Sequence, residues 1–149
     1  MYRCDIHSHT LISHDSQAPL SGMVHAAQAA GLQEFCVTDH CDLLDLDGKP
    51  WGAFPWPAAW EQYRAVREGS GDGLRLRLGI ELGSAPRDPA AAREILAQGG
   101  EELDFVLGSL HNWIGLEGEI DLYFSDYGKT PGLARKAMES TLAHTWTLV

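Results

Sequence analysis

The chain has 149 residues, of which 44% are hydrophobic and 21% charged, a composition typical of a folded globular domain. Its 11 Lys and Arg against 21 Asp and Glu give a formal net charge of −10. This balance argues against broad binding to nucleic acid or to anionic membranes, because both need surfaces rich in Lys and Arg. The length suits one domain but excludes a complete (β/α)₈ barrel, which needs about 250 residues.

In chain order, the hydrophobic pattern alternates between short strands and amphipathic helices. Strands are predicted at 2–6, 34–38, 74–80 and 104–107, and helices at 20–30, 58–68, 89–98 and 133–143. Gly31 stands where a C-cap glycine belongs, and Asp88 could cap the helix that begins at Pro89. This βαβαβαβ order predicts an α/β fold with a parallel sheet and right-handed crossovers.

The three cysteines, Cys4, Cys36 and Cys41, are too few and too irregularly spaced for a disulfide framework. Free thiols fit a reducing compartment. The first nine residues carry Arg3, Asp5 and two histidines rather than the apolar segment of a secretory leader. No run approaches the ~20 apolar residues that span a bilayer. We therefore expect a soluble, cytoplasmic chain.

Each predicted strand is followed by a histidine or an acidic residue. In such folds ligands gather at the carboxyl ends of the strands, so these residues are expected to lie close together. An extended segment with a period of two puts Asp5, His7 and His9 on one side. Five of the seven histidines lie in the segments that follow the predicted strands. They are His7, His9, His14, His40 and His111. Singly, each could be an ordinary polar turn residue; together they predict a metal site.

The mixture of imidazoles with carboxylates such as Glu81, without a pair of cysteines, is typical of a catalytic rather than a structural metal site. A carboxylate can bridge two ions, and two-metal sites suit the hydrolysis of phosphate esters. The positive field of the ions would also explain how an acidic protein attracts a phosphate.

Four segments of the chain resemble, in order and spacing, the first four motifs of the polymerase and histidinol phosphatase (PHP) superfamily. They are DIHSHTLISHDS (5–16), VTDHCD (37–42), LGIELG (78–83) and DFVLGSLHN (104–112). The greatest similarity is to members of the histidinol-phosphatase type, and it covers residues 2 to 127. The resemblance implies a distorted (β/α)₇ TIM-like barrel with metals at the carboxyl ends of its strands.

The resemblance also implies two or three divalent metal ions, Zn, Mn or Fe, and a ligand at each of six positions. These are His7 and His9 for the first metal, Glu81 bridging the first two, His111 for the second, and Asp15 and His40 for the third. Through the bound metals, His7, His9, Glu81 and His111 would be the catalytic residues. Asp5 and Asp39 are candidates to orient His7 and His40 from behind, or else to form structural turns.

The chain departs from the family beyond His111, where a further histidine and an Asp-x-His pair are expected. Only His144 follows, and we interpret it as a residue at the end of a helix rather than a ligand. Residues 1–149 are therefore expected to be the N-terminal part of a PHP domain, the first half of a truncated barrel. A partner or a second copy could cover its incomplete edge.

The function that this resemblance implies is metal-dependent hydrolysis of a small phosphate monoester, with histidinol phosphate of histidine biosynthesis as the substrate. One alternative is a metal-binding PHP fragment without catalysis, and another is a PHP phosphodiesterase or nuclease. The acidic balance argues against long nucleic acid but leaves a short oligonucleotide open. The aromatic residues Trp51, Phe54, Trp56 and Trp60 could form a wall over the site or anchor the next helix.

Overall fold

A computed structural model of the chain describes residues 1–45, 47, 49–69, 71, 73–111, 126–129 and 132–145. The chain divides into two compact units. Unit 1 consists of 1–41, 53–81 and 95–107, and unit 2 of 42–52, 82–94 and 108–149. Among the described residues, no helix is long and apolar enough to cross a membrane.

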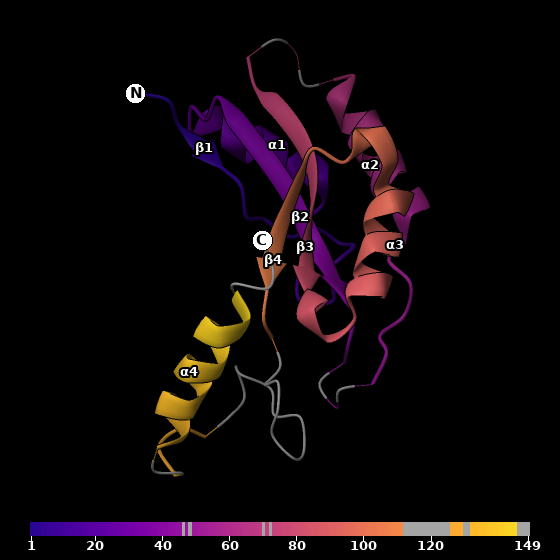
Figure 1. Ribbon diagram of the computed structural model, residues 1–149. Helices are drawn as coiled ribbons and strands as arrows, with labels where there is room; N and C mark the ends of the chain where they lie inside the picture. The colour runs from indigo at the N-terminus through magenta and orange to yellow at the C-terminus, as the bar shows by residue number, and fades with distance from the viewer. Residues whose placement is uncertain are drawn as a thin grey trace. The chain divides into compact units, whose positions relative to one another are not determined.

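The sheet has four strands in the order β1-β2-β3-β4, so each strand lies beside its neighbour in the sequence (Figure 1). The strands are β1 (Cys4–Asp5), β2 (Glu34–Asp42), β3 (Arg75–Gly83) and β4 (Phe105–Ser109). β1 pairs with β2 in parallel, with Cys4 opposite Glu34. Helices connect successive strands, as the strand and helix pattern predicted, and the parallel α/β sheet is confirmed.

Two strands extend further than the sequence predicted. β2 continues through Asp39 and His40 to Asp42, and β3 continues through Glu81 to Gly83. The prediction ended both strands where the apolar run ended. Asp39 and Glu81 in these extensions are polar, yet both are only 2% exposed. They can be buried because each carboxyl group has polar partners, the Thr10 amide for Asp39 and His9 for Glu81. β1 is shorter than predicted, with two residues in place of five.

The helices agree well with the predicted ranges. They are α1 (Leu20–Ala29), α2 (Trp56–Arg67), α3 (Pro89–Gly99) and α4 (Leu133–Thr145), with short 3₁₀ turns at Ala85–Arg87 and Gly100–Glu102. Gly31 has φ 69°, a left-handed conformation that favours glycine after α1. The Asp88 carboxylate accepts hydrogen bonds from the backbone N–H groups of Ala90 and Ala91, at 3.1 and 2.9 Å, which confirms the predicted cap of α3.

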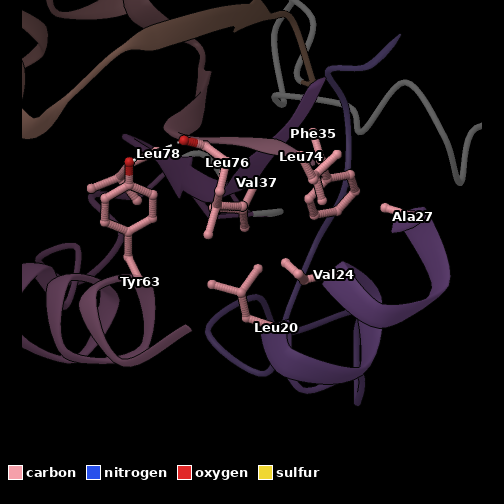
Figure 2. Packing of buried hydrophobic residues seen from close by; sticks show 9 residues of the cluster. All are labelled: Leu20, Val24, Ala27, Phe35, Val37, Tyr63, Leu74, Leu76 and Leu78. Atoms are coloured by element: carbon pink, nitrogen blue, oxygen red, sulfur yellow. Dashed lines mark hydrogen bonds between the residues drawn. The ribbon is translucent and has the colours of Figure 1, made fainter. Parts of the chain in front are cut away.

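The core of unit 1 lies between α1, α2 and one face of β2 and β3. Figure 2 shows side chains of both helices pointing toward the strands. The buried cluster consists of Leu20, Val24, Ala27, Phe35, Val37, Tyr63, Leu74, Leu76 and Leu78. Each large aliphatic side chain buried in this way stabilises the fold by about 1.5–3 kcal/mol. The Tyr63 hydroxyl donates a hydrogen bond to the Leu76 carbonyl at 3.2 Å, which satisfies its one polar group inside the cluster.

The aromatic run does not form one wall. Trp56 and Trp60 are stacked with ring centroids 5.7 Å apart, and Phe54 meets Trp56 edge-on at 4.7 Å. Phe54 and Trp56 are only 8% and 3% exposed, so these rings anchor the start of α2. Trp51, by contrast, belongs to unit 2 and is 45% exposed. Of the two interpretations of this run, the structure favours the anchor.

Candidate metal centre

The segment after β1 continues alongside β2 and carries two of the predicted ligands with it. The Thr38 amide donates to the Ser8 carbonyl at 2.8 Å, and the Ser8 amide donates to the Thr38 hydroxyl at 3.1 Å. These bonds fix the backbone between His7 and His9 beside the end of β2, where His40 lies. One backbone and one side-chain hydrogen bond therefore extend the pairing of the short β1 with β2 to the position of the histidines.

Glu81 is the centre of the first cluster of ligand atoms, all within unit 1. Its side chain is 3% exposed, and its Oε2 lies 3.2 Å from His7 Nε2 and 2.9 Å from His9 Nε2. The same oxygen lies 3.5 Å from His40 Nδ1. The sequence separates these residues by up to 74 positions, and the strand ends bring them to one carboxylate oxygen.

Asp15 is the centre of a second, more exposed cluster. Its Oδ2 lies 3.1 Å from His9 Nδ1 and 3.4 Å from His40 Nε2. Partial burial raises the pKa of the Asp15 carboxyl, but the hydrogen bond from His9 and the nearby His9 and His40 charges outweigh it. The net result is a pKa below the usual range for aspartate, so the carboxylate is ionised and available as a ligand near neutral pH.

Two groups of three residues could each hold an ion in unit 1, namely His7, His9 and Glu81, and His9, Asp15 and His40. Within each group one ligand atom per residue lies within 4.8 Å of the others. Five of the six predicted ligands therefore come together in these two groups. His14, one of the five histidines at the strand ends but not among the six ligands that the family resemblance implies, is close by, with its ring centroid 4.8 Å from that of His40.

The surroundings of His9 are compatible with a bound metal. A neutral imidazole carries one proton, yet both nitrogens of His9 face carboxylates, Asp15 at Nδ1 and Glu81 at Nε2. Nε2 is buried and has no hydrogen-bond partner among the described residues, although Glu81 Oε2 is only 2.9 Å away. The two atoms are close enough to be ligands of one cation. Imidazole with carboxylate is also the donor set that suits Zn, Mn and Fe.

The sixth predicted ligand, His111, belongs to unit 2. Its Nδ1 lies 2.6 Å from Oδ1 of Asp42, and the two side chains are 12% and 8% exposed. Asn112, the last residue of the fourth motif, lies outside the described residues. Sequence reasoning missed Asp42, although its place two residues after His40, on the same side of a strand, was a signal that could have found it.

Among the described residues, the two candidate supporting carboxylates do not contact the rings of His7 and His40, and of the two roles open to them the structural one fits their contacts better. The Asp5 side chain accepts a hydrogen bond from the backbone N–H of His7 at 3.1 Å, not from its ring. Asp39 accepts from Thr10 and Ser13 rather than from the His40 ring. His144 lies in the last turn of α4 and its Nδ1 donates to the Ser140 carbonyl at 2.7 Å, as a residue at a helix end would.

Comparison with known proteins places this arrangement in a family. A model of the PHP domain matches residues 5–146. No significant match was found among curated proteins.

Two solved structures share the fold. The histidinol phosphate phosphatase HisK of Lactococcus lactis, complexed with Zn, L-histidinol and phosphate, is 24% identical with a TM-score of 0.75. The HisK protein of Listeria monocytogenes is 18% identical, also with a TM-score of 0.75. Each comparison covers 95% of this chain but only 51% and 59% of the respective HisK chains. The chain thus spans about half the length of the structures it resembles.

Proposed function

We propose that this chain, which belongs to the PHP domain family, supplies the metal centre of a phosphoesterase that hydrolyses small phosphate monoesters. One observation carries the proposal. A single buried carboxylate oxygen, Oε2 of Glu81, lies within 3.5 Å of imidazole nitrogens from His7, His9 and His40. A carboxylate so surrounded by imidazoles is suited to bridging divalent ions.

The ligand set would be shared among two or three ions of Zn, Mn or Fe. We assign His7, His9 and Glu81 to one ion, and Asp15 and His40 to another. His9 belongs to both groups of ligand atoms, but a neutral imidazole has a single lone pair to offer, so it is assigned to the first ion. His111 is proposed as a further ligand on the strength of the family motif and of its pairing with Asp42.

When bound, such ions acidify a water molecule and offset negative charge on the phosphoryl oxygens. The protein's own residues supply the rest. Glu81 and Asp15 offer carboxylate oxygens to a cation, and Glu81, at 3% exposure, lies in a place from which water is largely excluded. His7 and Asp15 are the open side of the centre, with side chains 52% and 44% exposed, and a substrate would approach there.

Histidinol phosphate is the proposed substrate, which would place the chain in histidine biosynthesis and in the cytoplasm. Support comes from the L. lactis structure, which contains Zn, L-histidinol and phosphate and shares this fold. The net charge of −10 is also easier to reconcile with a small phosphorylated substrate than with a long polyanion.

The decisive experiment is an assay of the purified chain after removal of metal by a chelator and reloading with Mn²⁺ or Zn²⁺. We expect hydrolysis of p-nitrophenyl phosphate and, more efficiently, of histidinol phosphate. His9→Ala and Glu81→Ala should each abolish it, whereas His25→Ala, an exposed histidine of α1, should leave it unchanged. Selective cleavage of bis-p-nitrophenyl phosphate would instead indicate a phosphodiesterase.

A second candidate, a metal-binding domain without turnover, is favoured by the coverage of only 51% and 59% of the HisK chains. It predicts stoichiometric metal in the purified chain and no hydrolysis of either ester. A partner or a second copy that completes the barrel is part of the same question. Light scattering on the chain, together with the assay, would test whether activity accompanies self-association.

A further inference from the structure

Asp39 holds a buried carboxylate that makes no contact with a cationic side chain among the described residues. It is 2% exposed, and its Oδ1 accepts hydrogen bonds from the Thr10 amide at 2.5 Å and from the Ser13 hydroxyl at 2.7 Å. Its Oδ2 accepts from the Thr10 hydroxyl at 2.8 Å. A buried charge of this kind is tolerated only where several donors satisfy it, so these three bonds form a strong unit.

The residues that donate to Asp39 belong to the loop that carries the metal ligands. Thr10 follows His9 directly, and Ser13 lies two residues before Asp15. Thr10 is 0% and Ser13 4% exposed, which is unusual for hydroxyl residues in a loop. The Ser13 hydroxyl also accepts a hydrogen bond from the His40 amide at 2.9 Å. The Ser13 hydroxyl therefore connects the loop to the position of His40 on β2.

Helix α2 contributes a fourth residue, Gln62, to this hydrogen-bond network. The Gln62 side-chain amide donates to the Thr10 hydroxyl at 2.9 Å and lies 3.5 Å from Oδ2 of Asp39. Because α2 also supplies Tyr63 to the hydrophobic core, the network is attached to a helix that packs in the core of unit 1. None of these four residues provides an atom to either group of ligand atoms in unit 1.

We infer that Asp39, Thr10, Ser13 and Gln62 form an anchor that positions His9 and Asp15 opposite His40 before any metal binds. The inference rests on the proposed function only in that these ligands bind a divalent ion. Without the anchor, the loop would become ordered only when the metal binds. The free-energy cost of ordering it would then be subtracted from the binding free energy, and metal affinity would fall. Asp39, next to His40 in the sequence, is thus a positioning residue and not a ligand.

The test compares two substitutions at one buried position. Thr10→Val keeps the shape of the side chain and removes the hydroxyl, whereas Thr10→Ser keeps the hydroxyl. The readout is the affinity for Mn²⁺ and for Zn²⁺ alone, measured by competition with a chromophoric chelator well below the melting temperature. We expect Thr10→Val to weaken binding about 10- to 100-fold, as loss of a residue that supports a ligand does, and Thr10→Ser to bind within about threefold of the parent.

A matched control separates positioning from general destabilisation. Val24→Ala opens a gap in the core of unit 1 and should lower the melting temperature while leaving metal affinity unchanged. If Thr10→Val does not fold, as judged by circular dichroism, Ser13→Ala takes its place, with the same expected loss. Affinity equal to that of the parent in the folded anchor variant, or an equal loss in Val24→Ala, would overturn the inference.

The readout does not depend on turnover, so the two proposals fail separately. A parent chain that binds Mn²⁺ tightly but hydrolyses no ester would refute the phosphoesterase, and the variants would still decide the anchor. A parent chain that binds neither ion would overturn the anchor, because there would be no ligand set for it to position.

Discussion

Asp42 and His111 are joined by a short contact of 2.6 Å between Oδ1 and Nδ1, although 69 residues separate them in the sequence. Both side chains are largely buried, at 8% and 12% exposure, so the contact is shielded from solvent. A carboxylate that holds one nitrogen of an imidazole fixes the ring's orientation and makes its other nitrogen a better metal ligand. Asp42 thereby holds the His111 ring in one orientation, which supports the proposal that His111 is a metal ligand.

The first prediction concerns Asp42 itself. Asp42→Ala removes the acceptor, and we expect metal affinity to fall about 10- to 100-fold. Asp42→Asn retains an oxygen acceptor without the charge, so its metal affinity should lie between those of the parent and Asp42→Ala. Isothermal titration with Zn²⁺ measures the change. Asp47→Asn, at a side chain 76% exposed in the same unit, is the matched control and should bind as the parent does. Unchanged affinity in Asp42→Ala would mean that His111 is not a ligand.

Gly83 allows this pair to form, and its substitution is the second prediction. A Cβ atom at Gly83 would lie 1.8 Å from Asp42 Oδ1 and 3.0 Å from His111 Nδ1, so the pair or the end of β3 must shift. We expect Gly83→Ala to lower the free energy of unfolding by about 1–3 kcal/mol, as overpacking does, and to weaken metal binding as well. Urea denaturation measures the first effect.

Gly52→Ala provides the control in the same unit. No atom lies within 4 Å of a Cβ placed there, and its backbone is not left-handed. This substitution should be neutral or stabilise by up to about 1 kcal/mol. Equal stability of the Gly83 and Gly52 variants would contradict the steric argument.

The third prediction is that metal stabilises the fold. A ligand that binds only the native state adds about 2.7 kcal/mol at a concentration one hundred times its dissociation constant. Because both ligand groups of unit 1 include His9, His9→Ala should remove most of the rise in melting temperature that Mn²⁺ or Zn²⁺ produces. His25→Ala should retain it. A rise of the same size in both variants would indicate metal binding elsewhere.

Much of this arrangement could be predicted from the sequence, because the signals are local. Apolar runs located the strands and helices, and turn residues such as Asp88 and Gly31 located their ends. The position of His7, His9, His40 and Glu81 after or near strand ends was enough to expect them at one edge of the sheet. Their convergence on Glu81 Oε2 confirms that expectation for unit 1.

What the sequence could not supply were pairings between distant side chains. Asp39 was expected to support the His40 ring, since the two are adjacent, but in a strand adjacent side chains point to opposite faces. Asp39 therefore meets Thr10 and Ser13 instead. The spacing of Asp42 from His40 could have suggested it as a candidate, but its pairing with His111, which follows another strand, could not be expected from the sequence.

The fourth prediction follows from the ionic cluster where β2 and β3 begin. Glu34 accepts hydrogen bonds from the Tyr2 hydroxyl at 2.6 Å and from Arg77 at 2.9 Å, and Arg77 also binds Asp104 at 2.8 Å. The Tyr2 hydrogen bond, followed by that of Arg77, lowers the pKa of Glu34 below its usual value. Its stabilising contribution is therefore complete above about pH 4.3, the unfolded value, and is lost as pH falls through the lower folded value.

Glu34→Gln should accordingly make the stability of the chain less sensitive to pH between about pH 5 and pH 2. Chemical denaturation at several pH values would show a shallower slope for this variant than for the parent. Glu68→Gln, at an exposed glutamate at the end of α2, should leave the slope as it is. Identical slopes for the parent and Glu34→Gln would show that the cluster does not contribute in this way.

The fifth prediction concerns thiol reactivity, which separates the three cysteines, none of which forms a disulfide. Burial raises the pKa of Cys36 to about 12, and the side chain is 1% exposed. At pH 8 its thiolate fraction is therefore on the order of 10⁻⁴, and a thiol reagent cannot reach it in the folded chain. Cys41 is 4% exposed, whereas Cys4 is exposed. With Ellman's reagent at pH 8 we expect one fast thiol in native buffer and three in urea, and Cys4→Ser should abolish the fast phase. A second fast thiol in the native chain would mean that β2 opens readily, and the His40 end of the metal centre would then open with it.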